Sequence, residues 1–150
     1  MKIINVFLVS LICIQLYACN KNNKIEKTNN PNNTLTKMKI TIGSAVFTAT
    51  LNKNATATAF KAKLPMTINM TELNGNEKYF DLPFNLQTNA SNLATIQNGD
   101  LMLYGSNTLV LFYKTFSTSY SYTRIGHIEN PSGLALALGS GSVTVNFENN

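Results

Sequence analysis

Apolar and polar side chains alternate along much of residues 37–150. In the segment MKITI, Met38, Ile40 and Ile42 occupy one face of an extended chain, and polar residues lie between them. An alternation with a period of two is typical of strands that bury one face and expose the other. Strand patterns also occur in the segments AVFTATL, MTINMTEL, EKYFD, LMLY, TLVLFY, YTRIGHI and SVTVNF. We therefore expect about eight short strands.

Turn residues separate these segments. Asn74 and Gly75 form a strong signal for a tight hairpin between MTINMTEL and EKYFD. The triplet NGD at 98–100 precedes LMLY, and the triplet GSN at 105–107 connects LMLY to TLVLFY. Pro83 cuts short the strand that begins with EKYFD, because proline has no backbone N–H to donate to a neighbouring strand. Strands joined by such short turns are expected to pair antiparallel.

Two segments depart from the strand pattern and are expected to form short helices. The segment NATATAFKAKL is amphipathic, with Asn54 as its N-terminal cap and Pro65 directly after its end. The second helix is expected to begin with Asn130 as a cap and Pro131 at its first helical position, and to end before Gly139. This second helix should comprise only one or two turns.

Each predicted strand has an apolar face that must be buried against another part of the fold. Closing about eight antiparallel strands into a barrel buries these faces, and side chains then fill the interior without leaving a channel. A sandwich of two sheets is the alternative. We predict a mainly β fold for residues 37–150, a closed eight-stranded β-barrel with two short helices, in a single domain.

Four blocks of sequence resemble the bacterial cyclophilin-like family. They are MKITIG…FTATLNKNATATAFKAKLP, GNEKYFDLP, NGDLMLYGSNTLVLFY and YSYTRIGHI, and they occur in this order within residues 38–148. The resemblance implies a closed, eight-stranded cyclophilin-like barrel with two helices, in agreement with the alternation pattern. The activity of this family is largely uncharacterised, so the resemblance implies a fold and leaves the function open.

True cyclophilins are prolyl isomerases, and this activity is therefore an alternative function. Their catalytic strand resembles Phe-His-Arg-x-Ile and is followed by Phe-Met-x-Gln-Gly-Gly-Asp. Here only the triplet NGD at 98–100 is similar to the end of the second motif, and the sole arginine, Arg124, lies late in the chain. The chain also has no tryptophan for the rim of the proline pocket. We therefore expect a non-catalytic domain, with weak prolyl isomerase activity as the alternative.

The N-terminal segment has the features of a secretory signal. Lys2 provides a positive start, and the apolar stretch at 3–14 is too short to span a bilayer. The sequence LYAC that ends at Cys19 resembles the bacterial lipoprotein signal. This resemblance implies that residues 1–18 are a cleaved signal peptide and that lipid, including palmitate, is attached to Cys19. An ordinary signal peptide followed by an unmodified cysteine is the alternative.

Residues 19–36 are rich in asparagine and have no hydrophobic periodicity. They are expected to form a flexible linker between the lipid anchor and the domain. The expected location is the bacterial cell envelope, with the membrane as a partner through the N-terminal lipid. Asn20 and Lys21 do not resemble an acidic inner-membrane retention signal, which favours the outer membrane.

Charge and cysteine content restrict the possible partners and cofactors. The chain has a formal net charge of +5, but residues 37–150 carry only 8 basic against 6 acidic residues, a net +2 with scattered lysines, so nucleic-acid binding is not expected. Cys13 and Cys19 are the only cysteines, which leaves none in the domain for a disulfide or a metal site. His127 is the only histidine and is expected to lie at a rim or on the surface. We predict no metal site and no cofactor, and the sequence leaves the oligomeric state open.

The acidic residues do not form the pair that glycosidase chemistry requires. Glu72 and Glu77 flank a predicted turn and are expected to be solvated, while the carboxylate of Asp100 is expected to cap its turn. Ser119, His127 and Asp100 have the residue types of a hydrolase triad, but no nucleophile-elbow motif surrounds the serine. We predict no catalytic residues.

The remaining candidate for a site is the aromatic and hydroxyl-rich stretch FYKTFSTSYSYTRIGHI. Its middle, KTFSTSYS, has loop composition and is expected to leave the barrel as a polar excursion. Tyr120, Tyr122 and Arg124 are two positions apart, so in an extended chain they share one side. Such a row suits a peptide, a glycan or a carboxylate ligand. The predicted ligand-binding residues are Tyr104, Tyr113, Tyr120, Tyr122 and Arg124.

Structural packing is the simpler explanation for the same row. In that case Tyr122 packs on the barrel, and Arg124 pairs with an acidic residue such as Asp100 or Glu129. A structural envelope lipoprotein without any small ligand is a further alternative. The sequence therefore predicts a membrane-anchored lipoprotein whose domain binds a peptide or small ligand, and it leaves these alternatives open.

Overall fold

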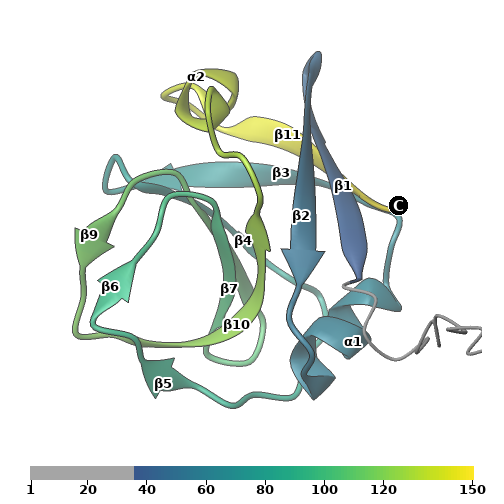
Figure 1. Cartoon of the computed structure of the whole chain (residues 1–150), viewed down its shortest axis with the longest axis vertical. Helices are drawn as coiled ribbons and strands as arrows, with labels where there is room; N and C mark the ends of the chain where they lie inside the picture. The colour runs from purple at the N-terminus through teal and green to yellow at the C-terminus, as the bar shows by residue number, and fades with distance from the viewer. Residues whose placement is uncertain (1–35) are drawn as a thin grey trace, which may run out of the picture. The chain divides into compact units, whose positions relative to one another are not determined.

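The computed structural model describes residues 36–150, which form a β-barrel with two short helices (Figure 1). The predicted signal peptide, Cys19 and the predicted linker apart from Thr36 lie outside the described residues. The elements are β1 (Lys37–Ile42), β2 (Ala45–Leu51), α1 (Ala55–Lys61), β3 (Met66–Leu73), β4 (Glu77–Asp81), β5 (Ser91–Asn92), β6 (Thr95–Ile96), β7 (Asp100–Tyr104), β8 (Thr108–Phe112), β9 (Phe116–Ser117), β10 (Ser121–Ile128), α2 (Leu134–Leu138) and β11 (Val143–Asn149). Neither helix in residues 36–150 has the length and apolar character needed to cross a membrane.

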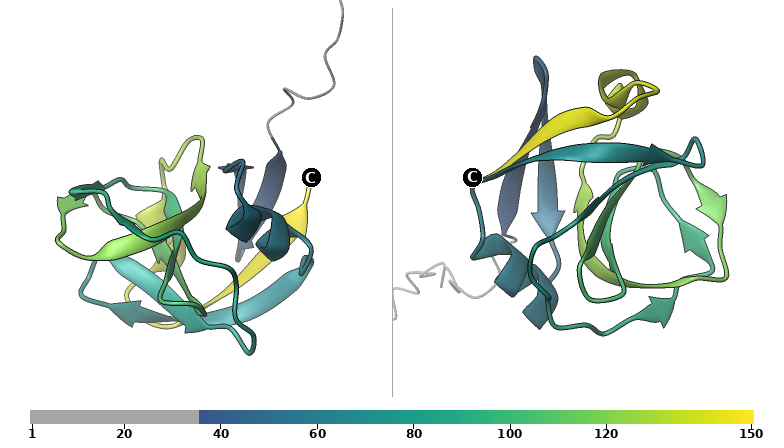
Figure 2. Two further views of the ribbon diagram at one scale, coloured as in Figure 1. Left: turned by 90° about the horizontal axis from the view of Figure 1, so that it is seen from below. Right: turned by 180° about the vertical axis from the view of Figure 1, so that it is seen from behind.

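The barrel wall is a closed ring of hydrogen-bonded strands. Neighbours follow the order β2, β1, β11, β3, β4, β8, β7 and β10, and β10 pairs back onto β2 (Figures 1 and 2). Each pairing in the ring is antiparallel. This ring confirms the predicted closed eight-stranded barrel and excludes the two-sheet sandwich.

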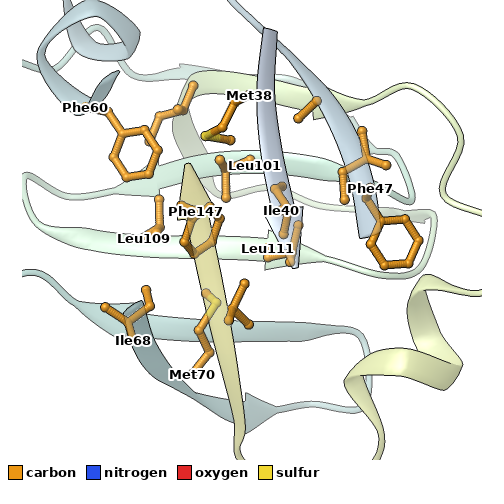
Figure 3. Packing of buried hydrophobic residues seen from close by; sticks show 14 of the residues in the cluster. Met38, Ile40, Phe47, Phe60, Ile68, Met70, Leu101, Leu109, Leu111 and Phe147 are labelled. Carbon is orange, nitrogen blue, oxygen red and sulfur yellow. The ribbon is translucent and has the colours of Figure 1, made fainter. Parts of the chain in front are cut away.

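The apolar faces of the strands meet inside the barrel. Met38 and Ile40 are fully buried, as their alternation predicts. Phe147 of β11 packs edge-on against Phe60 of α1, with ring centres 5.9 Å apart. Figure 3 shows the side chains that fill this core, including Ile68, Met70, Leu101, Leu109 and Leu111. Burying one such side chain stabilises a fold by roughly 1.5–3 kcal/mol.

Helix α1 has the predicted cap. The Oδ1 atom of Asn54 accepts a hydrogen bond from the backbone N–H of Ala57 at 2.7 Å, which satisfies one of the free donors of the first turn. The Nδ2 group of Asn54 donates to the backbone carbonyl of Arg124 at 2.8 Å. The same side chain therefore starts the helix and ties it to β10.

Helix α2 begins later than the sequence predicts. Asn130 does not cap the helix, because its Oδ1 atom accepts from the backbone N–H of Ser132 at 3.1 Å and so caps a separate turn. Gly133 then adopts a φ of 80°, and the helix starts at Leu134. The predicted start at Asn130 and Pro131 is therefore wrong, whereas the predicted end before Gly139 is confirmed.

Three strands of two residues each were not visible in the alternation pattern. β5 pairs with the start of β10, while β6 pairs with β9 so that Ile96 lies opposite Phe116. We call β6, β9 and the residues beside them the outer arm (residues 93–97 and 114–120). The arm packs on a second apolar cluster, on the outer side of the wall, whose buried members are Ile96, Met102, Val110, Phe112 and Tyr122. The predicted polar excursion therefore contains β9 and packs back on the barrel through Phe116.

Candidate functional site

A cleft of about 510 Å³ lies on the outer side of β4 and β8, and the outer arm forms its opposite wall. This volume lies within the range of roughly 300–1,000 Å³ that is typical of small-ligand sites. Strand β4 contributes three of the ring-bearing and acidic side chains of the lining, and β7, the outer arm and β10 contribute the others. They are Glu77, Tyr79, Asp81, Tyr104, Phe116, Tyr120 and Tyr122.

The alternation along β4 determines which of its side chains reach the cleft. Glu77, Tyr79 and Asp81 are two apart and line the cleft, while Lys78 and Phe80 lie on the other face. Tyr79 lies opposite Val110 of β8, which also lines the cleft, so the floor is a pair of neighbouring strands. The floor is therefore a rigid part of the barrel wall.

Aromatic rings form a continuous chain from the buried cluster to the open edge of the cleft. Phe112 contacts Tyr122 edge-on at 5.4 Å, and Tyr122 contacts Tyr104 at 5.6 Å. Tyr104 in turn meets Tyr120 edge-on at 6.1 Å. The exposed fraction rises along this chain from 6% for Tyr122 to 46% for Tyr104 and 61% for Tyr120. The two outer tyrosines therefore offer ring surface to a ligand.

Three of the five predicted binding residues come together in this cleft, namely Tyr104, Tyr120 and Tyr122. Tyr113 does not join them, because it belongs to the interior core and its hydroxyl donates to the carboxylate of Glu72. Arg124 is also outside the cleft lining, and its guanidinium lies 3.9 Å from Asp100. Of the predicted row, Tyr120 and Tyr122 therefore line the cleft, and Arg124 does not.

The packing interpretation also describes part of this region. Tyr122 is buried against the outer side of the wall while one side of it lines the cleft. Arg124 lies near Asp100, one of the two partners expected for it, whereas Glu129 pairs with Lys37. The ion pair therefore accounts for Arg124, while Tyr104 and Tyr120 contact other rings and still keep much of their surface exposed.

Glu77 lines this cleft but was not among the predicted ligand-binding residues. The expectation that it is solvated is wrong, because only 8% of the residue is exposed. Burial raises the pKa of its carboxyl group to about 7, and repulsion from Glu72 adds to this increase. Among residues 36–150, no hydrogen bond or ion pair to this carboxyl group offsets its burial. Glu77 is therefore a buried acid that lacks a partner and faces a cleft.

A signal for Glu77 was present in the strand EKYFD. The period of two places Glu77 on the same face as Tyr79 and Asp81, and therefore beside the aromatic floor. What the pattern could not give was the position of the outer arm, which covers this face of β4.

Glu72, on the other side of the turn, is not a freely solvated acid either. Lys78 is fully buried, and its ammonium group lies 2.5 Å from Glu72 and donates to the carbonyls of Gly139 and Gly141. Burial opposes ionisation of Glu72, but hydrogen bonds from Lys78, Tyr113 and the Gly75 backbone outweigh it and lower its pKa. Burial, followed by the bond to Glu72, raises the pKa of Tyr113 to about 12. This network connects β4 to the segment after α2, and within it the positive charge of Lys78 is paired with the negative charge of Glu72.

Asp100 has the capping role that the sequence predicts. Its Oδ2 atom accepts from the backbone N–H of Gln97 at 2.9 Å, and its Oδ1 atom lies 3.0 Å from Nδ1 of His127. Ser119 lines the cleft, whereas Asp100 and His127 do not, so the three residues do not assemble into a triad. Among residues 36–150, no group of three His, Cys, Asp or Glu side chains is placed to hold a metal ion.

Comparison with known proteins identifies the fold. A hypothetical protein from Archaeoglobus fulgidus, whose structure was determined in solution, shares 19% sequence identity and superposes with a TM-score of 0.58. The match covers 77% of this chain and 95% of that protein, and at this identity it shows similarity of fold alone. No curated protein matches the chain. The sequence model described as the cyclophilin-like family matches residues 40–148, a region that contains both helices and nearly all of the barrel, and the chain therefore belongs to the cyclophilin-like family.

Proposed function

We propose that this protein is a membrane-anchored envelope lipoprotein whose cyclophilin-like domain binds a peptide or small ligand without transforming it. The observation that carries the proposal is the cleft of about 510 Å³, whose outer rings are exposed and whose floor is part of the barrel wall. Rigid aromatic rings bury a large ligand surface at little cost in conformational entropy. A preformed cleft of this kind favours binding.

Prolyl isomerase activity has less support. Arg124 is the only arginine of the chain, and it lies beside Asp100 outside the cleft lining. An arginine near the reacting bond is what the cyclophilin catalytic strand would supply. The tyrosine cleft therefore serves better as a binding site than as an isomerase centre.

Ligand-observed NMR on the full chain in detergent micelles tests this proposal. A fragment library of amines, alcohols, carboxylic acids and short peptides is screened against the wild type and against Tyr120→Ser. Because Tyr120 is exposed, its removal should leave the fold intact while reducing the binding of cleft ligands about three- to tenfold. The matched control is Leu136→Ser, which removes an exposed apolar side chain from α2, away from the cleft lining.

Fragments that bind the wild type and the Leu136→Ser variant but not the Tyr120→Ser variant are the expected result. A library in which no compound distinguishes these proteins would contradict a ligand site in the cleft. A proline-peptide isomerisation assay on the same samples is expected to show no acceleration. Acceleration that Tyr120→Ser abolishes would replace the binding function with an enzymatic one.

A further inference from the structure

The acceptor groups at one end of the cleft lack donors. Glu77 is only 8% exposed as a residue, and its carboxyl group has no hydrogen bond or ion pair within residues 36–150. Asn76, the preceding residue, also lines the cleft, and its Oδ1 atom is buried without a partner in the same part of the chain. A buried acceptor without a donor, such as the Asn76 amide oxygen, destabilises the folded state. A ligand that brings donors would remove this destabilisation.

The charges that line the cleft are all of one sign. Of the described residues in its lining, Glu77 and Asp81 are acidic and none is basic. Glu72 lies close enough to act on Glu77 electrostatically and is also an acid. The nearest ammonium group along the strand, that of Lys78, lies on the opposite face of β4 and is held by Glu72 and two carbonyls. The cleft therefore attracts positive charge and repels anions.

The aromatic rings add a second attraction for a cation. The Tyr104 and Tyr120 rings contact each other edge-on, and both residues remain partly exposed, so their outer ring surfaces are open to a cation at the edge of the cleft. Among the rings of the cleft, Tyr122 lies near Glu77, because the charge of Glu77 contributes, after burial, to raising the pKa of Tyr122 to about 12. Rings beside a carboxylate are the combination that binds ammonium and guanidinium groups in proteins.

We propose that the cleft binds a small organic cation, whose protonated amine or guanidinium group pairs with Glu77 and whose body packs against the aromatic rings that line the cleft. This inference rests on the proposed binding function and specifies the ligand's chemical class. It replaces the carboxylate among the expected ligands, because the arginine that would have paired with a carboxylate lies outside the cleft lining. The cleft volume of about 510 Å³ fits a small molecule, which is the occupant we assign to it.

Binding should depend on pH in a defined direction. A cation is held best when Glu77 is ionised, so affinity should increase as the pH rises through about 7. Glu72 across the turn acts on Glu77, Asp81 lies further along β4 in the same cleft, and both are acidic, while Lys78 lies on the opposite face of β4. Burial raises the pKa values of the nearby Tyr113 and Tyr122 to about 12. The affinity change between about pH 6 and pH 8 is therefore expected to come from Glu77.

Three probes of similar size and different charge test the inference: phenethylamine, 2-phenylethanol and 3-phenylpropionate. Their affinities for the full chain are measured by NMR titration in detergent micelles at about pH 6 and pH 8. Phenethylamine should bind at least about tenfold more tightly than the alcohol at pH 8, and the acid should bind most weakly. The Glu77→Gln variant should lose the preference for the amine and its pH dependence. The control Glu148→Gln removes an equal charge on β11, where Glu148 pairs with Lys39 outside the cleft lining, and should keep both.

The outcomes separate this inference from the proposed function. Equal binding of the amine and the alcohol, or an amine preference that survives Glu77→Gln, would overturn the cation site and leave a ligand-binding cleft. Failure of all three probes and of the fragment library would count against both. A fourth probe, the peptide Ac-Ala-Lys-Ala-NH2, tests the source of the cation, since tighter binding of this peptide than of phenethylamine would contradict a small-molecule occupant.

Discussion

Glu72 and Glu77 flank the same hairpin turn, yet their pKa values shift in opposite directions. Both are withdrawn from water, but hydrogen bonds from Lys78 and Tyr113 lower the pKa of Glu72, whereas Glu77 has no such bonds among the described residues. Burial is therefore the main influence on the pKa of Glu77 and raises it to about 7. A largely buried carboxyl group without a hydrogen-bond or ion-pair partner makes the folded state less stable, and such residues often have a functional role.

Replacing Glu77 by glutamine should change how stability depends on pH. The folded pKa of about 7 exceeds the usual value of 4.5, so the folded state binds more protons, and stability falls as the pH rises through this window. Glu77→Gln removes this fall and should raise the free energy of unfolding at pH 8 by about 1–3 kcal/mol, with little change at pH 4. Urea unfolding at both pH values measures the effect, and Glu148→Gln is the control. Parallel pH profiles for the wild type and the Glu77→Gln variant would contradict the raised pKa.

At the scale of elements, β10 connects the barrel to the cleft. It pairs with β5 at its start, with β7 along its length and with β2 at its end, where it closes the ring. Its early residue Tyr122 lines the cleft, and its later residue Gly126 lies opposite Leu51 at the closure. The register against β7 shifts between Arg124 and Gly126, so this strand contains a bulge just before the closure.

The closure of the ring depends on a glycine in β10. A Cβ atom at Gly126 would lie 2.7 Å from the backbone oxygen of Thr50, which cannot move without disturbing β2. We expect Gly126→Ala to lower the free energy of unfolding by about 1–3 kcal/mol. The control is Gly141→Ala, because a Cβ atom there meets nothing within 4 Å and the φ angle is not in the left-handed region. Thermal unfolding compares the two, and equal melting temperatures would show that the closure tolerates a side chain.

At the scale of the whole molecule, the barrel could be predicted from sequence and most of the cleft could not. Its eight wall strands are long enough to show a period of two, and the bounds found for β2 and β3 are those of the predicted segments. The strands β5, β6 and β9 have two residues each, too few to show any period. The alternation in EKYFD places Glu77 on the face of Tyr79 and Asp81, but it could not show that this face lines a cleft, because the cleft forms between the wall and the outer arm. Three of the tyrosines were found because aromatic residues are conspicuous even without a known fold.

The proposed lipid anchor at Cys19 is expected not to affect folding of the barrel, since the first barrel strand begins only at Lys37. Cys19→Ala removes the thiol that would carry lipid, and stable membrane binding requires more than one acyl chain, so the variant should move from the membrane pellet to the soluble fraction. Cys13→Ala is the matched control, because residue 13 lies within the segment that cleavage would remove. Fractionation and immunoblotting measure this difference, and a Cys19→Ala protein that stays in the pellet would contradict lipidation. Ligand titrations on the released variant should give the same affinities as the anchored protein, because the cleft lining begins at Leu73.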